Sequence, residues 1–256
     1  MKKLISFGAG NMAQALIPPL ANFYKVYSYT PTGTRAKVLA ELTKGEVIED
    51  FSELNADVYF ICCKPQQFSD LSQKLKGKLN KDALVVSLLA GTTLKTLKEK
   101  LDHDNVLRLM PNTPSQFGHG VTLYFSDKNF EDLISQMKAS NLMVKMNSED
   151  QLDQVTAVTG SGPAYIFEFG RILFESLVDM GITKSDAKEM VAELFLGSST
   201  MMKKREDEFE TLREQVTSKG GVTYEALKVF QQAGLSDITK SALKANYLRS
   251  QELSKS

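Results

Sequence analysis

The feature that most constrains the fold of this chain is a glycine-rich segment close to its amino terminus. The segment, Gly8-Ala9-Gly10-Asn11-Met12-Ala13, follows the apolar run Leu4–Phe7 and fits the pattern G-x-G-x-x-A. In a strand–turn–helix unit the first glycine permits a tight turn, and the second lets the backbone approach a pyrophosphate at the helix N-terminus. The pattern also fits a tight turn that binds nothing. In this position we expect it to bind a dinucleotide through Gly8, Gly10, Asn11 and Met12.

Short apolar runs recur through the first 149 residues and alternate with helical stretches. Uninterrupted runs such as DVYFICC and ALVVSLL are typical of strands buried on both faces of a sheet. The alternation predicts an α/β fold with a Rossmann-like, doubly wound parallel sheet. Pro18 and Pro19 predict that the first helix is short or kinked. We expect strands at Leu4–Phe7, Lys25–Ser28, Asp57–Cys63, Ala83–Leu89 and Val106–Met110, with further candidates at Gly120–Phe125 and Leu142–Met146.

The pattern changes near residue 150, beyond which the sequence predicts helices only. We therefore expect two domains, an α/β domain over residues 1–149 and an all-α domain over 150–256. The segment Pro163–Gly181 is apolar almost all round, which is typical of a long buried helix. Thr183 begins a capping pattern that starts another helix. Gly234 and Ser236 fit the C′ glycine of one helix and the N-cap of the next.

The end of the predicted second strand bears on the choice of cofactor. An acidic residue about 20 positions after the glycine motif binds the ribose of NAD, but the first acidic residue of this chain is Glu41. The segment YSYTPTGTR instead offers hydroxyls and one guanidinium, which suit a 2′-phosphate and favour NADP over NAD. An ordinary hydroxyl-rich turn with a solvated arginine is the alternative. The candidate residues are Thr30, Thr32, Thr34 and Arg35.

Other loops follow later strands on the same side of the sheet, where ligands of open α/β sheets bind. Lys64 and Pro65 follow one strand, Ala90 and Gly91 follow another, and the run Met110–Pro114 follows a third. Each loop taken singly fits a plain turn. Their shared placement predicts further cofactor contacts from Lys64, Pro65, Ala90 and Gly91.

Composition excludes several classes of partner. Lys+Arg 31 balances Asp+Glu 31, so the net charge of +0 gives no support for binding nucleic acid or an anionic membrane. No apolar run approaches the ~20 residues of a membrane helix, and Leu4–Phe7 is too short for the core of a signal peptide. Cys62 and Cys63 are adjacent and read as reduced and buried. Neither His103 nor His119 lies in a metal-ligand pattern, so we expect a cytoplasmic, metal-free protein with a small-molecule substrate.

Six segments in order carry a resemblance that covers nearly the whole chain: FGAGNMAQAL, CCKPQ, SLLAGTT, RLMPNTP, TAVTGSGPAY and VTSKGGVTYEAL. Together they resemble the pyrroline-5-carboxylate reductase family. The resemblance implies that NADPH, or NADH, delivers hydride to the C=N carbon of 1-pyrroline-5-carboxylate and gives L-proline, the last step of proline biosynthesis. It also implies a homodimer through the helical domain, sometimes built into larger rings, with an active site shared between subunits. Lys219 departs from the family, which usually has proline there, and Val222 stands where a smaller residue is common.

The segment TSKGGVT, residues 217–223, is the candidate substrate site. We expect Thr223 to open a helix from Tyr224 to about Ala233, and free N–H groups at a helix N-terminus suit an anion. The predicted carboxylate ligands are the N–H groups of Gly221, Val222 and Thr223 with the Ser218 hydroxyl, and the resemblance points the same way. A glycine turn with Thr223 as N-cap only is the alternative.

Two catalytic candidates accompany this segment. The Thr223 hydroxyl is placed to hydrogen-bond the imine nitrogen. Glu206 matches a family position near that nitrogen, where a carboxylate stabilises an iminium; the alternative is a solvated face of a charged helix in REDEFETLRE.

Two other functions stay open from the sequence. One is a related NADP-dependent imine or 3-hydroxyacid oxidoreductase. A hydroxyacid enzyme of this plan is expected to carry a lysine on the long helix, and the stretch 164–179 has none. The other is a non-enzymatic NADPH-binding regulator, which has no need of a second anion site at TSKGGVT.

Overall fold

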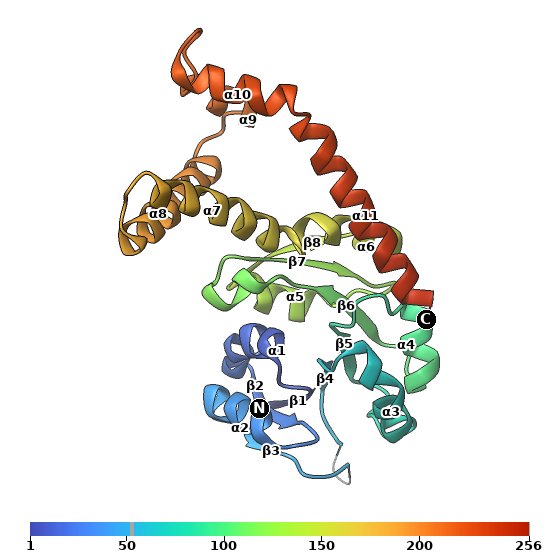
Figure 1. Ribbon diagram of the computed structural model, residues 1–256. Helices are drawn as coiled ribbons and strands as arrows, with labels where there is room; N and C mark the ends of the chain where they lie inside the picture. Colours follow the sequence, from blue (N-terminus) through green and yellow to red (C-terminus); the bar gives the residue numbers. More distant parts are fainter. Residues whose placement is uncertain (52–53, 256) are drawn as a thin grey trace. The chain divides into compact units, whose positions relative to one another are not determined.

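The computed structural model describes residues 1–51 and 54–255, and the chain divides into two compact units (Figure 1). The sheet unit comprises Met1–Pro163 and Asn246–Ser256, and the helical unit comprises Ala164–Ala245. The helix after the sheet and the end of the last helix therefore belong to the sheet unit. Tyr247 donates a hydrogen bond to Asp150, and Asn246 Nδ2 donates to Ser161 Oγ over 3.0 Å.

The described residues of the sheet unit form one eight-stranded sheet with the order β3-β2-β1-β4-β5-β6-β7-β8. Neighbouring strands are parallel except β6 and β7, which are antiparallel. This confirms the Rossmann-like fold class. The two-residue strand β3 had no sequence signal. The strands are β1 (Lys2–Phe7), β2 (Tyr24–Tyr29), β3 (Glu46–Val47), β4 (Val58–Ile61), β5 (Leu84–Ser87), β6 (Val106–Met110), β7 (Gly120–Phe125) and β8 (Asn141–Lys145).

Helices cover both faces of this sheet. The first helix ends at Leu16, and a 3-10 turn begins at Pro18, as the two prolines predicted. The elements are α1 (Asn11–Leu16), η1 (Pro18–Asn22), α2 (Thr34–Thr43), α3 (Pro65–Leu75), α4 (Leu94–Leu101), η2 (Thr113–Phe117), α5 (Glu131–Lys138) and α6 (Glu149–Thr159).

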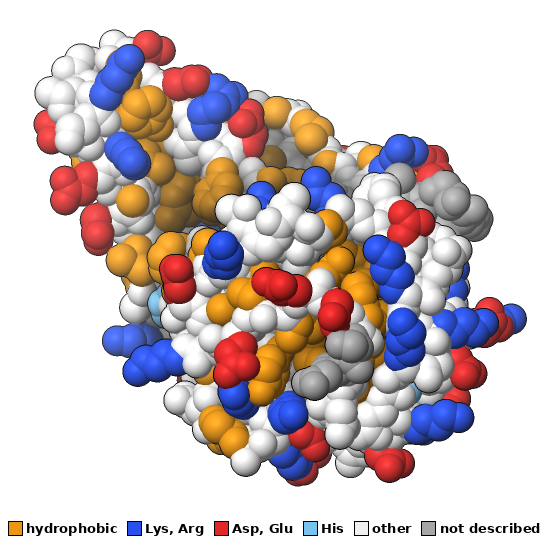
Figure 2. Space-filling model, turned by 90° about the horizontal axis from the view of Figure 1, so that it is seen from below, with side chains coloured by type: hydrophobic (Ala, Val, Ile, Leu, Met, Phe, Trp, Pro, Cys, Tyr) orange, Lys and Arg blue, Asp and Glu red, His pale blue; other side chains and the backbone are white. Residues whose placement is uncertain are grey.

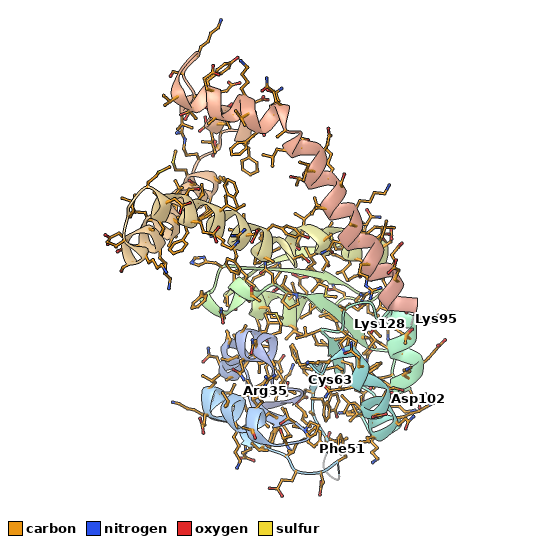
Figure 3. All side chains as sticks on the ribbon, viewed as in Figure 1. Arg35, Phe51, Cys63, Lys95, Asp102 and Lys128 are labelled. Atoms are coloured by element: carbon orange, nitrogen blue, oxygen red, sulfur yellow. The ribbon has the colours of Figure 1, made fainter. Side chains whose placement is uncertain are left out.

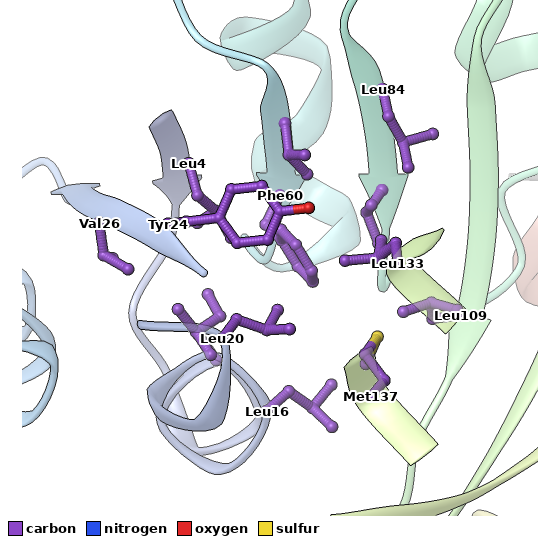
Figure 4. Packing of buried hydrophobic residues seen from close by; sticks show 14 of the residues in the cluster. Leu4, Leu16, Leu20, Tyr24, Val26, Phe60, Leu84, Leu109, Leu133 and Met137 are labelled. Atoms are coloured by element: carbon purple, nitrogen blue, oxygen red, sulfur yellow. The ribbon is translucent and has the colours of Figure 1, made fainter. Parts of the chain in front are cut away.

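The core lies on both sides of the sheet. On one face, strand residues such as Leu4 and Phe60 pack against Leu16 of α1 and Leu133 of α5 (Figure 4). On the other face, residues of α3 and α4 such as Leu75 and Leu97 cover the alternate strand positions. Burial of each leucine contributes roughly 1.5–3 kcal/mol. Because both faces are covered, the strands read as continuous apolar runs.

The helical unit consists of helices only among its described residues. Thr183 caps α8 as predicted, since its hydroxyl accepts from the Asp186 N–H over 3.2 Å. Gly234 follows α10 with φ +74°, as predicted, but Ser236 is not an N-cap. The last helix begins at Leu235, so Ser236 lies within its first turn. The helices are α7 (Gly162–Asp179), α8 (Lys184–Lys204), α9 (Phe209–Gln215), α10 (Val222–Gln232) and α11 (Leu235–Lys255).

The prediction that Pro163–Gly181 is buried was wrong. In α7 no residue is buried, and the apolar side chains Ile166, Phe167 and Ile172 are exposed by 51%, 69% and 46%. Phe169 makes edge-to-face contacts with Phe195 and Phe230, which cover only part of the helix. The helical unit therefore leaves α7 partly uncovered, and other apolar side chains of the same unit, such as Leu194 and Leu196, are exposed as well.

The distribution of surface charge and the hydropathy of the helices agree with what the composition predicted. Figure 2 shows acidic and basic side chains intermixed on the face that it views. Among the described residues, none of the helices has the length and apolar character needed to cross a bilayer.

Candidate functional site

A cleft of about 650 Å³ lies at the carboxyl ends of β1, β2 and β4. The strand order reverses between β1 and β4, and in open α/β sheets ligands bind at such a switch point. Pro65, Ala90 and Gly91 are not among the residues that line it; Pro65 begins α3, and the other two follow β5. The predicted cofactor residues that do line it are Gly8, Gly10, Asn11, Met12, Thr30, Thr32, Arg35 and Lys64, whereas Thr34 does not.

Gly8 makes the close approach that the motif predicted. Its φ is +107°, and a Cβ at this position would lie 2.5 Å from the carbonyl carbon and oxygen of Cys62. Its N–H donates to the Tyr29 carbonyl oxygen over 2.9 Å, and its carbonyl accepts from the Ser6 hydroxyl. Gly8 therefore joins the ends of β1, β2 and β4 in a conformation that L side chains rarely adopt.

Thr30 and Arg35 provide polar groups on the β2 side of the cleft. The Thr30 hydroxyl is buried and has no hydrogen-bond partner among the described residues, so it is free to bond a ligand. Arg35 is exposed in the first turn of α2, and its Nη1 would lie 3.9 Å from a Cβ at Gly10. Among the described residues Arg35 has no ion pair. An orphan hydroxyl and a free guanidinium beside the glycine loop fit the 2′-phosphate of NADP.

An aromatic wall of the cleft was missed by the sequence reasoning. Phe51 stacks on Phe7 with ring centroids 5.9 Å apart and meets Tyr29 edge-on at 4.7 Å. Arg35, Phe51 and Cys63 come from three separate segments, as labelled in Figure 3. Tyr29 and Phe7 end adjacent parallel strands, which is the one signal that pointed to them; Phe51 lies in a loop with no pattern.

Cys62 and Cys63 are free and line the same cleft. They are half-buried, less enclosed than predicted. Burial raises the pKa of Cys62 to about 12 and that of Cys63 to about 11. Both thiols therefore stay protonated near neutral pH and act as small apolar walls.

The candidate substrate segment lies at the start of α10. The helix begins at Val222 with Gly221 as N-cap, so the prediction that Thr223 opens a helix from Tyr224 was wrong. The Gly221 N–H donates to the Ser218 carbonyl oxygen over 2.9 Å, and Gly220 has φ +72°. Val222 and Thr223 thus hold the first two helical positions, whose N–H groups have no acceptor within the helix.

The Ser218 hydroxyl lies against this N-terminus. A Cβ at Gly221 would be 2.4 Å from Ser218 Oγ, so a larger residue would displace the hydroxyl. Thr223 is exposed, and Val222 is 91% exposed. The arrangement offers N–H donors and two hydroxyls to a small anion.

Glu206 does not lie in a helix. α8 ends at Lys204 and α9 begins at Phe209, so Glu206 is an exposed residue of the connection. The neighbouring Arg205 pairs with Asp207 over 2.8 Å. Among the described residues Glu206 has no ion pair, which leaves its carboxylate available.

Comparisons with known proteins agree with this geometry. Residues 149–253 match the family model for pyrroline-5-carboxylate reductase dimerisation, and residues 4–91 match that for NADP oxidoreductase, coenzyme F420-dependent. A pyrroline-5-carboxylate reductase of Staphylococcus haemolyticus is 34% identical over 99% of this chain and 98% of its own length.

Solved structures extend the match to the whole fold. That of a pyrroline-5-carboxylate reductase from Coxiella burnetii has TM-score 0.86 and 32% identity, covering 100% of this chain and 99% of that one. That of the Plasmodium falciparum enzyme with NADP bound has TM-score 0.85 at 24% identity, covering 99% and 98%, and shows the shared fold. With a cleft suited to NADP, a free helix N-terminus and relatives matched from end to end, this chain belongs to the pyrroline-5-carboxylate reductase family.

Proposed function

We propose that this chain reduces 1-pyrroline-5-carboxylate to L-proline with hydride from NADPH, and that the cleft and the start of α10 carry the reaction. The observation that supports this most is the family match over the full chain, which includes the segment TSKGGVT. The cleft supplies the cofactor site and the helix N-terminus supplies the substrate site.

The cofactor is assigned to the residues that line the cleft. The Gly8–Met12 backbone would hold the pyrophosphate, and Thr30 with Arg35 would hold the 2′-phosphate. Lys64 adds a cation at the end of β4. Pro65, Ala90 and Gly91 do not line the cleft, and we assign them to the part of the cofactor that extends beyond it, past the ends of β4 and β5. NADH lacks the phosphate that Arg35 would pair, so it is the weaker cofactor.

The substrate carboxylate is assigned to α10. The N–H groups of Val222 and Thr223 and the Ser218 hydroxyl are the donors. The Gly221 N–H joins them only if it leaves the Ser218 carbonyl oxygen, to which it donates in the structure.

The proposed reaction does not need a strong general acid from the protein. NADPH supplies the hydride to the C=N carbon, the nitrogen takes one proton, and the double bond becomes a single bond. Imines are basic, so the substrate carries that proton as an iminium or takes it from water. The Thr223 hydroxyl would orient the nitrogen, and the Glu206 carboxylate would stabilise its positive charge. The largest contribution would be proximity, because holding the hydride donor beside the C=N carbon removes much of the entropic cost of bringing two reactants together.

We also propose the division of labour along the chain. Residues 1–149 bind NADP, and residues 150–256 bind substrate and form a homodimer. The exposed apolar side chains of α7 support this, because an uncovered helix of that composition is typical of an interface. We propose a cytoplasmic location, because the proposed reaction is a biosynthetic step. Light scattering of wild type and Phe167→Glu tests the interface: a dimer or larger ring that becomes monomeric supports it, and a monomeric wild type contradicts it.

Steady-state oxidation of NADPH with racemic 1-pyrroline-5-carboxylate tests the reaction. Wild type should turn over. Thr223→Ala should lower kcat by about 10–100-fold, because a hydrogen bond to a charged group contributes about 1.5–3 kcal/mol and each ~1.4 kcal/mol is tenfold in rate. Thr239→Ala is the matched control, because the Thr239 hydroxyl donates to the Leu235 carbonyl within α11. Binding of NADPH without turnover of this imine would contradict the proposal.

A further inference from the structure

A buried ion cluster lies outside the cleft and has no part in the assignments above. The Arg108 side chain on β6 is 1% exposed. Its Nη1 donates to Glu149 Oε1 over 2.6 Å, and its Nη2 donates to Asp153 Oδ1 over 3.0 Å. The two carboxylates lie one turn apart on α6. A buried guanidinium left without a partner is strongly destabilising, so the cluster fixes α6 on the sheet.

One oxygen of this cluster makes a third contact. Glu149 Oε1 also accepts the backbone N–H of Leu94 over 2.7 Å. Leu94 is the first residue of α4, and the helix is capped in addition by the Thr93 hydroxyl, which accepts from the Thr96 N–H. Glu149 therefore holds β6 and the start of α4 to α6 through a single atom.

The loop that this contact fixes is one of the proposed cofactor loops. Leu94 follows Ala90–Thr93, the segment after β5, in which Gly91 has φ +67°. In a Rossmann fold the second nucleotide half lies over the strands beyond the switch point, here β4, β5 and β6. The position of Ala90 and Gly91 at that end depends on where α4 begins.

We propose that Glu149 is a positioning residue for NADPH, which acts by accepting the Leu94 N–H and so fixing the Ala90–Thr93 loop. Arg108 on β6 orients the Glu149 carboxylate by donating a hydrogen bond to the same oxygen. The inference rests on the proposed function of that loop. On this proposal NADPH affinity depends on the length of the Glu149 side chain, which brings an oxygen to the Leu94 N–H, and does not depend on the charge of the carboxylate.

Two conservative variants separate reach from charge. Glu149→Asp keeps the charge beside Arg108 but is one methylene too short to reach the Leu94 N–H. Glu149→Gln keeps an oxygen at that reach and loses the charge. Asp127→Asn is the matched control. Asp127 pairs over 2.5 Å with Lys98, which lies on α4, the helix that Leu94 begins, but at a site away from the loop.

The measurements are the KM of NADPH in the reductase assay and the Kd of NADPH by fluorescence. Glu149→Asp should raise both about tenfold, which corresponds to ~1.4 kcal/mol of binding free energy lost when the loop is no longer fixed, and should leave the KM of the imine within about twofold. Glu149→Gln and Asp127→Asn should stay within about threefold of wild type.

The opposite order, with Glu149→Gln the weaker binder, would overturn the inference and assign the effect to charge. Equal NADPH affinity in all variants, with only thermal stability lowered, would also overturn it, since Glu149 would then be structural. An inactive wild type that still binds NADPH contradicts the proposed function, whereas the Kd comparison continues to test Glu149.

Discussion

Replacement of Gly8 by alanine is the sharpest test of the cofactor loop, because its effect follows from backbone geometry. The new Cβ would lie 2.5 Å from the carbonyl carbon and oxygen of Cys62 and 2.7 Å from the Cys63 nitrogen. All three atoms belong to the backbone at the end of β4, so no side chain can turn aside to make room. The φ of +107° adds strain for any L residue.

The loss of stability expected for Gly8→Ala has two parts, backbone strain and overpacking, and a control variant at Gly77 carries only the first. Gly77 also has a positive φ, +71°, but a Cβ there would meet nothing within 4 Å. Gly77→Ala should therefore cost only the backbone strain, about 1 kcal/mol. At Gly8 the φ of +107° lies outside the left-handed helical region, so the strain there is about 1–3 kcal/mol. Overpacking adds about 1–3 kcal/mol, so the total for Gly8→Ala is about 2–6 kcal/mol.

Thermal unfolding and NADPH titration measure the two consequences. About 1 kcal/mol corresponds to ~2–4 °C in a chain of this size, so Gly8→Ala should lower Tm well beyond Gly77→Ala. It should also weaken NADPH binding at least tenfold, because the loop moves away from β4, whereas Gly77→Ala should bind normally. Equal Tm shifts and unchanged NADPH affinity would refute the argument.

Three further predictions follow from the same structure. Arg35→Met should raise the KM of NADPH about tenfold or more and leave that of NADH unchanged, because only NADPH carries the phosphate; equal effects on both cofactors would contradict the assignment. Lys219→Pro should raise the free energy of unfolding by about 0.4–1 kcal/mol in urea denaturation, because residue 219 precedes Gly220 in a turn of type II form, where proline is favoured. Because burial raises the pKa of Cys63 to about 11, iodoacetamide should alkylate the native protein at pH 8 about a hundredfold more slowly than the urea-unfolded chain, and the rate should rise with pH towards that pKa; a fast reaction at pH 8 would contradict the burial.

Local signals predicted most of the sheet unit. The runs around β4 and β5 are apolar because both faces of those strands are buried, so their positions could be read directly. The break at Pro18 followed from the missing N–H of proline. β3 is only two residues long and carries no pattern of its own. The connection from β6 to β7 is too short for a parallel crossover, so the antiparallel pairing could have been inferred from the spacing of these two strands.

The errors in the helical unit have a different cause. Threonine is a common N-cap, so the sequence favoured Thr223 at the start of α10. The turn closed by the Gly221 N–H and the Ser218 carbonyl oxygen instead makes Gly221 the N-cap. For α7, apolar composition predicts that the helix is covered, but it does not say whether the cover comes from the same chain or from another.

The two proposed anion sites share one physical strategy in a chain with no net charge. Each combines backbone N–H groups with nearby cations, which are Arg35 and Lys64 at the cleft and Lys219 beside the start of α10. At physiological ionic strength charges are screened beyond ~8 Å, so a balanced surface contributes little to attraction from a distance. Affinity for both anionic ligands must then come from groups in contact with them. This is why single changes at Gly8, Arg35 or Thr223 should have large effects, whereas changes of surface charge elsewhere should have small ones.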